Sequence, residues 1–261
     1  MRRHIKVISF LLTVLFLVFL FSGFNSRNEA AIKTGIIGAM DEEVNSLKEA
    51  LQNAKTTNIS GMEFFEGTLD GESVVVVKCG VGKVNAGICT ELLINVFDVD
   101  RIINTGVAGS LDAAIDIGDI VVSTDAVQHD FDLTPLGYAP GELDGIGSAS
   151  LPADEAMRES AVKAVAECAP DVHVFEGRVC TGDQFISSDE QKAAIISQFG
   201  GLCCEMEGGA IAQVCCQNNI PFVIIRAISD KADGSATMNY SEFVQEAAIR
   251  CAAITRCMLS H

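Results

Sequence analysis

The chain has 261 residues, 49% of them hydrophobic, and a formal net charge of −17 at pH 7. This length and composition predict one globular domain of about 230 residues behind an N-terminal segment. Such an acidic chain repels phosphate backbones, and no basic cluster in the sequence reverses that repulsion locally, which argues against nucleic acid as a partner.

The N-terminal segment, residues 1–30, differs from the rest of the chain. Basic residues within its first six positions precede an apolar run from Val7 to Phe21, an order typical of a secretory signal or a signal anchor. The run is short for a membrane span, which needs about twenty apolar residues, although residues up to 24 extend it. We therefore expect export, or membrane association through residues 7–24, with residues 31–261 as the functional domain. Without a working signal the protein would stay in the cytoplasm.

From residue 32 onward, apolar runs alternate with amphipathic segments. The pattern predicts strands over 32–39, 101–109, 119–133, 172–182 and 221–230, and a hairpin over 62–80 that turns at Asp70 and Gly71. It predicts helices over 41–54, 83–97, 154–167, 188–198 and 240–259. Residues 136–152 are rich in Gly, Pro and Ser and are predicted to form a long irregular loop.

The alternation of strands and helices is typical of an α/β fold. We predict a three-layer α/β/α sandwich with a central mixed β-sheet. In such folds ligands gather at the carboxyl ends of strands, so the polar residues that follow the apolar strands are the first candidates for function.

All ten cysteines lie beyond residue 78. Export and an even number of cysteines favour disulfides. Most of these residues, however, lie in apolar runs, where free cysteine packs as a small hydrophobic side chain, and these local patterns favour free thiols. The two indications conflict, so the redox state stays open. The sequence has no C-x-x-C and no His/Cys spacing suited to zinc, and we expect no metal.

Several predicted strands end in groups that could carry chemistry. They are Glu43 after the first strand, Gly106 and Gly109, Phe185 and Ile186, the stretch Glu205–Met206–Glu207, and Arg226, Ser229 and Asp230. These carboxylates, together with one arginine, one methionine and one aromatic ring, could converge on one pocket. The glycines would let a ligand approach the backbone closely.

The two glutamates at 205 and 207 stand among apolar neighbours and pose a specific question. A buried carboxylate without a partner costs several kcal/mol or takes up a proton, so each needs a protein or ligand partner. If this stretch is a strand, alternation places both side chains on one face.

Each charged candidate also has a purely structural interpretation. Glu205 and Glu207 could be solvated at a sheet edge, Glu43 could complement a helix dipole, and Asp230 could cap a helix. Arg226 could form a structural ion pair with one of these acids.

The segments "GIIGAMDEEV", "INTGVAG", "GDQFIS", "CEMEGGAIA" and "VIIRAISDKAD" occur in this order along the chain. In order and approximate spacing they resemble the bacterial 5′-methylthioadenosine/S-adenosylhomocysteine nucleosidases, from about residue 33 to the C-terminus. The resemblance implies a phosphorylase/hydrolase-like fold, a nucleosidase domain over 31–261, and no cofactor.

The resemblance also implies hydrolysis of an N-glycosidic bond through an oxocarbenium-like ribosyl centre. Asp230 matches the general acid that protonates adenine N7, and Glu43 matches the general base that activates the water attacking C1′. Adenine leaves poorly as an anion, so an acid at N7 contributes directly to the transition state.

Substrate contacts are implied at further positions. Glu207 matches the carboxylate that binds the ribose hydroxyls, Met206 lies against sugar and base, and Phe185 stacks on adenine. Other implied contacts or positioning groups are Ala39, Met40, Gly109, Ile186, Glu205, Arg226, Ser229 and Tyr240, the last in the 5′-thio pocket. Glu205 would be held by Arg226 or by a bound water.

The family is dimeric, so the resemblance implies a homodimer in which the loop over 136–152 lends Tyr138 to the neighbouring subunit's 5′ pocket. Two positions depart from the family pattern. Val107 stands where a serine is common, which removes one hydroxyl near the water and the ribose, and Leu136 replaces a frequent phenylalanine, from which we expect an altered tolerance of the thio substituent.

Two other functions remain as alternatives. A purine nucleoside phosphorylase of the same superfamily would use phosphate, but a carboxylate at the attack position would repel it. An exported nucleoside-binding protein without catalysis would have little use for both Glu43 and Asp230. The choice among methylthioadenosine, S-adenosylhomocysteine and 5′-deoxyadenosine as preferred substrate stays open.

Overall fold

The computed structural model describes residues 32–260, so the expected signal segment at 1–30 lies outside the described residues. Between 32 and 260, no helix is long and apolar enough to cross a membrane.

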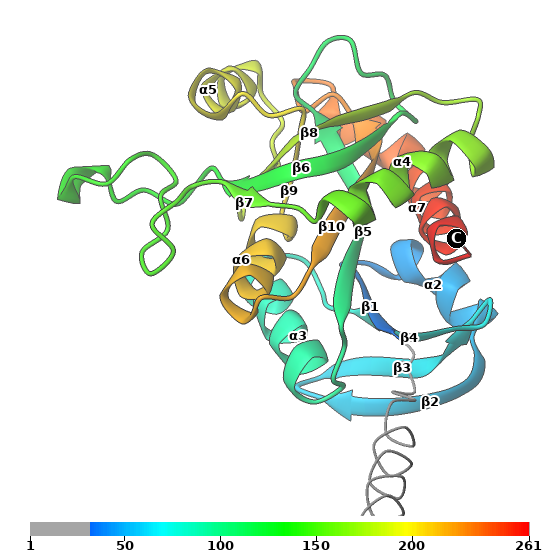
Figure 1. The fold of residues 1–261 in the computed structure, drawn as a ribbon. Helices are drawn as coiled ribbons and strands as arrows, with labels where there is room; N and C mark the ends of the chain where they lie inside the picture. The colour runs from blue at the N-terminus through cyan, green and yellow to red at the C-terminus, as the bar shows by residue number, and fades with distance from the viewer. Residues whose placement is uncertain (1–31, 261) are drawn as a thin grey trace, which may run out of the picture. The chain divides into compact units, whose positions relative to one another are not determined.

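The described part of the chain is built on one mixed sheet (Figure 1). Its strands are β1 (Lys33–Gly38), β2 (Gln52–Ile59), β3 (Met62–Leu69), β4 (Glu72–Lys78), β5 (Arg101–Ser110), β6 (Ile120–Gln128), β7 (Leu151–Pro152), β8 (Val174–Thr181), β9 (Cys203–Glu205) and β10 (Phe222–Asp230). The order is β10-β6-β8-β9-β5-β1-β4-β3-β2, with β7 on β6. Because β10 also pairs with β5, the first five strands of this order close into a ring.

Helices cover both sides of the sheet, which confirms the three-layer α/β/α prediction. They are α2 (Asp41–Ala50), α3 (Lys83–Asn95), α4 (Glu155–Cys168), α5 (Asp189–Phe199), α6 (Gly208–Asn218) and α7 (Ala236–Leu259), with one 3-10 turn at Thr134–Leu136. Figure 1 shows α3 and α6 on one side and α2, α4 and α7 on the other. Two apolar clusters match these layers, one with Leu93 and Ile211 and one with Val44 and Ala248.

The strands that matter for function lie at the centre of this sheet. β5 runs parallel to both β1 and β10, so the carboxyl ends of all three meet at one edge. A register shift between Ile228 and Asp230 places Asp230 opposite Gly109. β9 joins the same edge by pairing antiparallel with β5, where Cys204 lies opposite Gly109.

Some predicted boundaries are wrong. The first helix ends at Ala50 rather than 54, and Gln52–Ile59 forms strand β2 on the sheet edge. This strand is almost wholly exposed, so it carries no hydrophobic alternation, and its pairing with β3 decides its conformation. The strand predicted over 119–133 ends at Gln128, and the last helix begins at Ala236.

The stretch with the two glutamates is also not one strand. β9 ends at Glu205 and α6 begins at Gly208, so Glu207 occupies the N-cap position of a helix. Strand alternation therefore does not relate the two side chains.

The irregular loop predicted over 136–152 is confirmed, apart from the short strand β7. Figure 1 shows the segment between β6 and β7 standing away from the rest of the domain. Gly137, Gly141, Gly145 and Gly147 adopt positive φ angles, a conformation that other residues rarely take. We refer to residues 131–150 as the arm.

One disulfide joins Cys168, at the end of α4, to Cys257, near the end of α7. The local patterns that favoured free thiols are therefore wrong for this pair, because only the packing of α4 against α7 brings the two together. The other eight cysteines are free, and all of them except Cys216 are buried. For those buried residues the role of a small hydrophobic side chain holds.

Candidate active site

A cavity of about 220 Å³ lies where β1, β5, β9 and β10 end. It is lined by Ala39, Met40, Glu43, Val81, Val107, Ala108, Gly109, Phe185, Cys204, Glu205, Met206, Glu207, Ser229, Asp230 and Tyr240. Eleven of these are predicted site residues, so distant parts of the sequence converge as expected. Ile186 lines a small adjoining compartment that shares Phe185 and Asp230 with the main cavity.

Two predicted residues lie elsewhere. Arg226 is 1% exposed and lies behind the cavity wall. Tyr138 belongs to the arm, where its hydroxyl donates to Asp144 at 3.4 Å, and it does not line the cavity of its own chain.

Glu43 is held by backbone amides in the first turn of α2. One carboxylate oxygen accepts hydrogen bonds from Ala39 N at 2.6 Å and Met40 N at 3.0 Å, and the other from Val107 N at 3.1 Å. The side chain is 1% exposed, so it is not simply a solvated acid that complements the helix dipole. Burial raises the pKa of Glu43, while the charge of Arg226 and the backbone hydrogen bonds lower it.

Two glycines of β5 leave room for side chains of the protein itself. A Cβ on Gly106 would overlap the Arg226 guanidinium and the Glu43 carboxylate, and one on Gly109 would come within 2.7 Å of Asp230 Oδ1. The sequence analysis predicted that these glycines let a ligand approach the backbone. In the structure they let the side chains of Arg226, Glu43 and Asp230 pack against β5.

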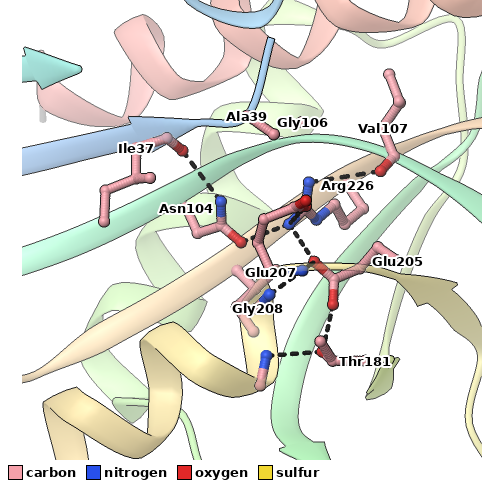
Figure 2. Close-up of polar contacts among 12 residues, drawn as sticks. Ile37, Ala39, Asn104, Gly106, Val107, Thr181, Glu205, Glu207, Gly208 and Arg226 are labelled. Atoms are coloured by element: carbon pink, nitrogen blue, oxygen red, sulfur yellow. Dashed lines mark hydrogen bonds and ion pairs between the residues drawn. The ribbon is translucent and has the colours of Figure 1, made fainter. Parts of the chain in front are cut away.

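Figure 2 shows the buried guanidinium of Arg226 at the centre of a polar network. Its Nη2 donates to Asn104 Oδ1 at 2.5 Å and to the Glu205 carboxylate, and its Nη1 donates to Val107 O at 3.4 Å. Asn104 in turn donates to Ile37 O at 3.0 Å, which ties the network to β1.

Protein groups account for the burial of Glu205, which is 7% exposed. Besides Arg226, its carboxylate accepts from the Thr181 hydroxyl, from Glu207 N at 3.1 Å and from Gly208 N at 2.7 Å. The amides belong to the start of α6, where the helix dipole also favours a negative charge. Pairing with Arg226, one of the two partners expected from the sequence, is confirmed, and a solvated sheet edge is wrong.

Glu207 lies farther than Glu205 from the Arg226 guanidinium. Its Oε1 accepts from Gly82 N at 2.9 Å, and its Oε2 lies 3.6 Å from Arg226 Nη2. Burial and the neighbouring charge of Glu205 raise the pKa of Glu207 to about 7, against the opposing effect of Arg226. This carboxylate thus keeps capacity to accept hydrogen bonds inside the cavity that it lines.

Asp230 ends β10 and has only neutral hydrogen-bond partners. Its Oδ2 accepts from Ser229 Oγ at 3.0 Å and its Oδ1 from Ala232 N at 2.9 Å. Burial raises the pKa of Asp230, and these two hydrogen bonds lower it to a lesser extent. The N-cap of α7 is Ser235, so the interpretation of Asp230 as a helix cap is wrong.

An aromatic pair forms another part of the wall. The rings of Phe185 and Tyr240 meet edge to face, with centroids 5.5 Å apart and an interplanar angle of 76°. The Tyr240 hydroxyl donates to the Met40 sulfur at 3.1 Å.

Sequence reasoning missed several residues that complete the site. Val81, Ala108 and Cys204 line the cavity, while Asn104 and Thr181 orient Arg226 and Glu205 from behind. The last two had a signal in the sequence, because each is a polar residue that follows an apolar pair of its strand, Ile102–Ile103 or Val179–Cys180. Within residues 32–260, no group of three or more His, Cys, Asp or Glu side chains is placed to hold a metal ion.

Comparison with known proteins places this chain in a family. The family model of the phosphorylase superfamily matches residues 33–260. A 5′-methylthioadenosine/S-adenosylhomocysteine nucleosidase of an Exiguobacterium species is 45% identical over 85% of this chain and 94% of its own length.

Solved structures agree with that match. A nucleosidase of this name from Neisseria meningitidis, in complex with methylthio-immucillin-A, has a TM-score of 0.84 and 37% identity, covering 87% of this chain and 98% of that one. Another from Colwellia psychrerythraea, in complex with adenine, has a TM-score of 0.84 and 40% identity, covering 88% and 95%. The chain belongs to the 5′-methylthioadenosine/S-adenosylhomocysteine nucleosidase family of the phosphorylase superfamily.

Proposed function

We propose that this protein hydrolyses the N-glycosidic bond of 5′-methylthioadenosine and S-adenosylhomocysteine, releasing adenine and the 5-thioribose product. The observation that carries this proposal is the pair of buried carboxylates, Glu43 and Asp230, on the wall of one cavity. They come from different strand ends and have different partners, as two groups with opposite roles in proton transfer require. Membership of the family supports the same activity.

Asp230 acts as the general acid. Its burial favours the protonated form, and its partners Ser229 and Ala232 orient the carboxyl without supplying a positive charge. The proton passes to adenine N7, so the base leaves as a neutral molecule. Phe185 stacks on the departing ring.

Glu43 activates the water that attacks C1′. Three backbone amides fix its carboxylate, and the charge of Arg226 partly offsets the rise in its pKa that burial causes. The positive charge that develops on the ribose is stabilised by this carboxylate and by Glu207.

Glu207 accepts hydrogen bonds from the ribose hydroxyls, and Met206 contacts sugar and base. Glu205 and Arg226 act through these groups: the guanidinium, held by Glu205 and Asn104, sets the position of the second glutamate. We therefore assign Glu205 and Arg226 a positioning role.

Hydrolysis is favoured over phosphorolysis by the charges around the attack position. The cation nearest to Glu43 is already paired with Glu205, and Lys83 is paired with Asp130 at 2.6 Å. Neither offers the converging positive charges that phosphate needs, and the Glu43 carboxylate would repel the anion.

Adenine release from methylthioadenosine, S-adenosylhomocysteine and 5′-deoxyadenosine, with and without inorganic phosphate, tests the proposal. We expect release from the two thioethers at the same rate in both conditions. A requirement for phosphate together with a ribose 1-phosphate product would establish the phosphorylase instead. Tight binding without release would leave a nucleoside-binding protein.

We also propose that the protein works as a homodimer, with Tyr138 of the partner subunit completing each cavity. Exposed apolar side chains lie on and just before α3: Val81, which lines the cavity, is 49% exposed, Val84 72% and Ile88 43%. The arm, which carries Tyr138, stands away from the rest of the described residues (Figure 1), so it is placed to extend towards a neighbouring subunit. The double change Val84→Glu, Ile88→Glu should give monomers by light scattering and reduced turnover, and a wild-type monomer with full activity would contradict this.

We propose that the protein is exported. A disulfide such as Cys168–Cys257 persists in oxidising surroundings, and the N-terminal sequence places basic residues before an apolar run, as secretory signals do. Cell fractionation and N-terminal sequencing of the isolated protein test this. Recovery of uncleaved protein in the cytosolic fraction would contradict it.

A further inference from the structure

A backbone amide from outside α6 holds the Glu207 carboxylate, which under the proposed function faces the ribose. Gly82 N donates to Glu207 Oε1 at 2.9 Å. Gly82 is the N-cap of α3 and has a φ of 99°, a conformation that other residues rarely take. The dipole of α3 also favours a negative charge at this position. The placement of the carboxylate therefore depends on what holds the start of α3.

Two aspartates hold Lys83, the first residue of α3. The Lys83 backbone amide donates to Asp183 Oδ1 at 2.8 Å, and its ammonium group donates to Asp130 Oδ1 at 2.6 Å. Asp130 Oδ2 accepts from Asp183 N at 2.8 Å, so the three residues form a closed circuit of hydrogen bonds. We refer to Lys83, Asp130 and Asp183 as the clasp. A Cβ on Gly82 would lie 3.1 Å from Asp183 Oδ1, so the clasp packs directly against this glycine.

The two opposite charges of the clasp are largely sheltered from solvent. The side chains of Lys83 and Asp130 are 18% and 19% exposed. Burial raises the pKa of Asp130, but the hydrogen bonds from Lys83 and from Asp183 N outweigh burial and hold that pKa below its ordinary value. Asp130 is therefore ionised at neutral pH, and its ion pair with Lys83 is complete.

The clasp is also linked to the helix that Glu207 caps. The Lys83 ammonium group donates to Gln128 Oε1 at 3.3 Å, and Gln128 Nε2 donates to Gly209 O at 3.3 Å, in the first turn of α6. One hydrogen-bond network therefore connects the starts of α3 and α6, the two helix ends that meet at Glu207.

We propose that Lys83 and Asp130 are positioning residues that fix the Gly82 amide against Glu207 and so hold this carboxylate in place for the ribose hydroxyls. Neither side chain lines the cavity, so both act through Gly82 and not on the substrate. This inference rests on the proposed function and deepens its account of ribose recognition. No covalent step is involved.

The first test compares the affinities of the full protein for two carbocyclic analogues of 5′-methylthioadenosine, one with both ring hydroxyls and one without them. Their rings lack the oxygen that would stabilise an oxocarbenium ion, so neither is hydrolysed. Lys83→Met should weaken binding of the first analogue by about 3- to 10-fold, the range expected for one hydrogen bond. Binding of the second analogue should stay nearly unchanged.

Lys78→Met is the matched control, because Lys78 forms its ion pair with Asp41 at 2.7 Å, between side chains that are 44% and 52% exposed. Both affinities should stay at their wild-type values in this control. In a Glu207→Gln background the effect of Lys83→Met should largely disappear, since the two residues are coupled through Gly82. An equal loss for both analogues overturns the inference, and so does a loss that persists in the Glu207→Gln background.

The second test is the pH at which affinity for the first analogue rises. Burial raises the pKa of Glu207, and the Gly82 hydrogen bond lowers it. Lys83→Met and Asp130→Asn both loosen the clasp, the second because an amide has one acceptor oxygen where the carboxylate has two. Both variants should therefore move the midpoint to higher pH. Direct action of the two charges on Glu207 would instead move it in opposite directions, and opposite shifts or no shift would refute the positioning role.

The midpoint belongs to Glu207 if Glu207→Gln abolishes it. This comparison separates it from the titration of neighbouring ionisable groups, which include Glu43, Cys79, His129, Glu205, Arg226 and Tyr240. The proposed function fails separately, if the wild-type enzyme releases adenine from neither thioether. Adenine release by the wild type, with unchanged discrimination between the two analogues in Lys83→Met, refutes only the role of the clasp.

Discussion

Two regions of the cavity bury carboxylates in opposite ways. At one end, Asp230 has a hydroxyl and an amide as partners. Elsewhere in the cavity wall, Glu43, Glu205 and Glu207 all lie within the influence of one guanidinium, that of Arg226. Burial lowers the pKa of this arginine, but the three acids outweigh burial and raise it.

Under the proposed function, this difference concerns the proposed acid, Asp230, and the proposed base, Glu43, of one cavity. Burial by itself pushes every carboxyl towards its protonated form, which suits the proton donor at Asp230. The charge of Arg226 opposes that effect at Glu43, although burial outweighs it and the pKa of Glu43 is raised overall. Burial raises the pKa of both carboxyls; at Glu43 the largest opposing effect is the charge of Arg226, whereas at Asp230 it is the hydrogen bond from Ala232 N.

The largest effect is expected from Asp230→Asn, which removes the proton donor but keeps the shape. Adenine release should fall towards the upper part of the range of about 10²–10⁴-fold that is typical of general acids and bases. Affinity for an unreactive nucleoside analogue should stay measurable by calorimetry. Turnover within a few-fold of wild type would remove Asp230 from its role.

Glu43→Gln tests the opposite end. We expect kcat to fall by about 10²-fold, in the lower part of the same range, because a bound water can still attack slowly. Analogue affinity should barely change, since the side chain keeps its shape and its amide oxygen can still accept from Ala39 N and Met40 N, although the hydrogen bond from Val107 N is lost. Normal turnover would mean that Glu43 only supports α2 and that another group activates the water.

Removing the shared cation should cost stability more than any surface change. Arg226→Met leaves buried carboxylates without their partner, and loss of one member of a buried pair typically costs about 3–5 kcal/mol. Arg256→Met is the matched control, because Arg256 forms its pair with Asp70 at the surface, where such pairs contribute about 0–1 kcal/mol. Equal losses in urea unfolding would show that the central network is not what stabilises the site.

Removing the disulfide, which lies away from the cavity, separates effects on stability from effects on catalysis. Replacing Cys168 and Cys257 together by serine should lower the free energy of unfolding by about 2–4 kcal/mol, as is typical for loss of a disulfide. It should leave kcat unchanged, because neither residue lines the cavity. Dithiothreitol should lower the stability of the wild type only, and Cys216→Ser serves as a control at a free cysteine. A free energy of unfolding equal to that of the wild type would mean that the disulfide does not stabilise the fold.

The smallest effect concerns the ribose contact. Glu207→Gln should weaken an analogue with both ribose hydroxyls by about 1.5–3 kcal/mol, and much less an analogue that lacks them, because a charged acceptor is lost. Since the pKa of Glu207 is about 7, wild-type affinity for the first analogue should rise as pH increases through neutrality. That pH dependence should flatten in the variant, and an unchanged slope would exclude Glu207 as its source.

Much of this site follows from the sequence itself. The apolar strands and the polar residues directly after them are local patterns, and parallel strands bring their carboxyl ends together by geometry. That is why Glu43, Asp230 and Phe185 were predicted to share a pocket before any contact was known. The family also follows from the sequence, because five short segments keep their order.

Only the tertiary structure determined which charged side chains form pairs. In the sequence, nothing distinguishes Glu205 from Glu207. In the structure, Glu205 accepts hydrogen bonds from a hydroxyl, two backbone amides and Arg226. Glu207 accepts from one backbone amide and lies farther from the Arg226 guanidinium. Strand β2 and the disulfide of Cys168 with Cys257 were likewise decided by tertiary contacts. A buried charge, an edge strand and a cross-link are each stabilised by a neighbour that is distant in sequence. A local sequence pattern contains no information about that neighbour.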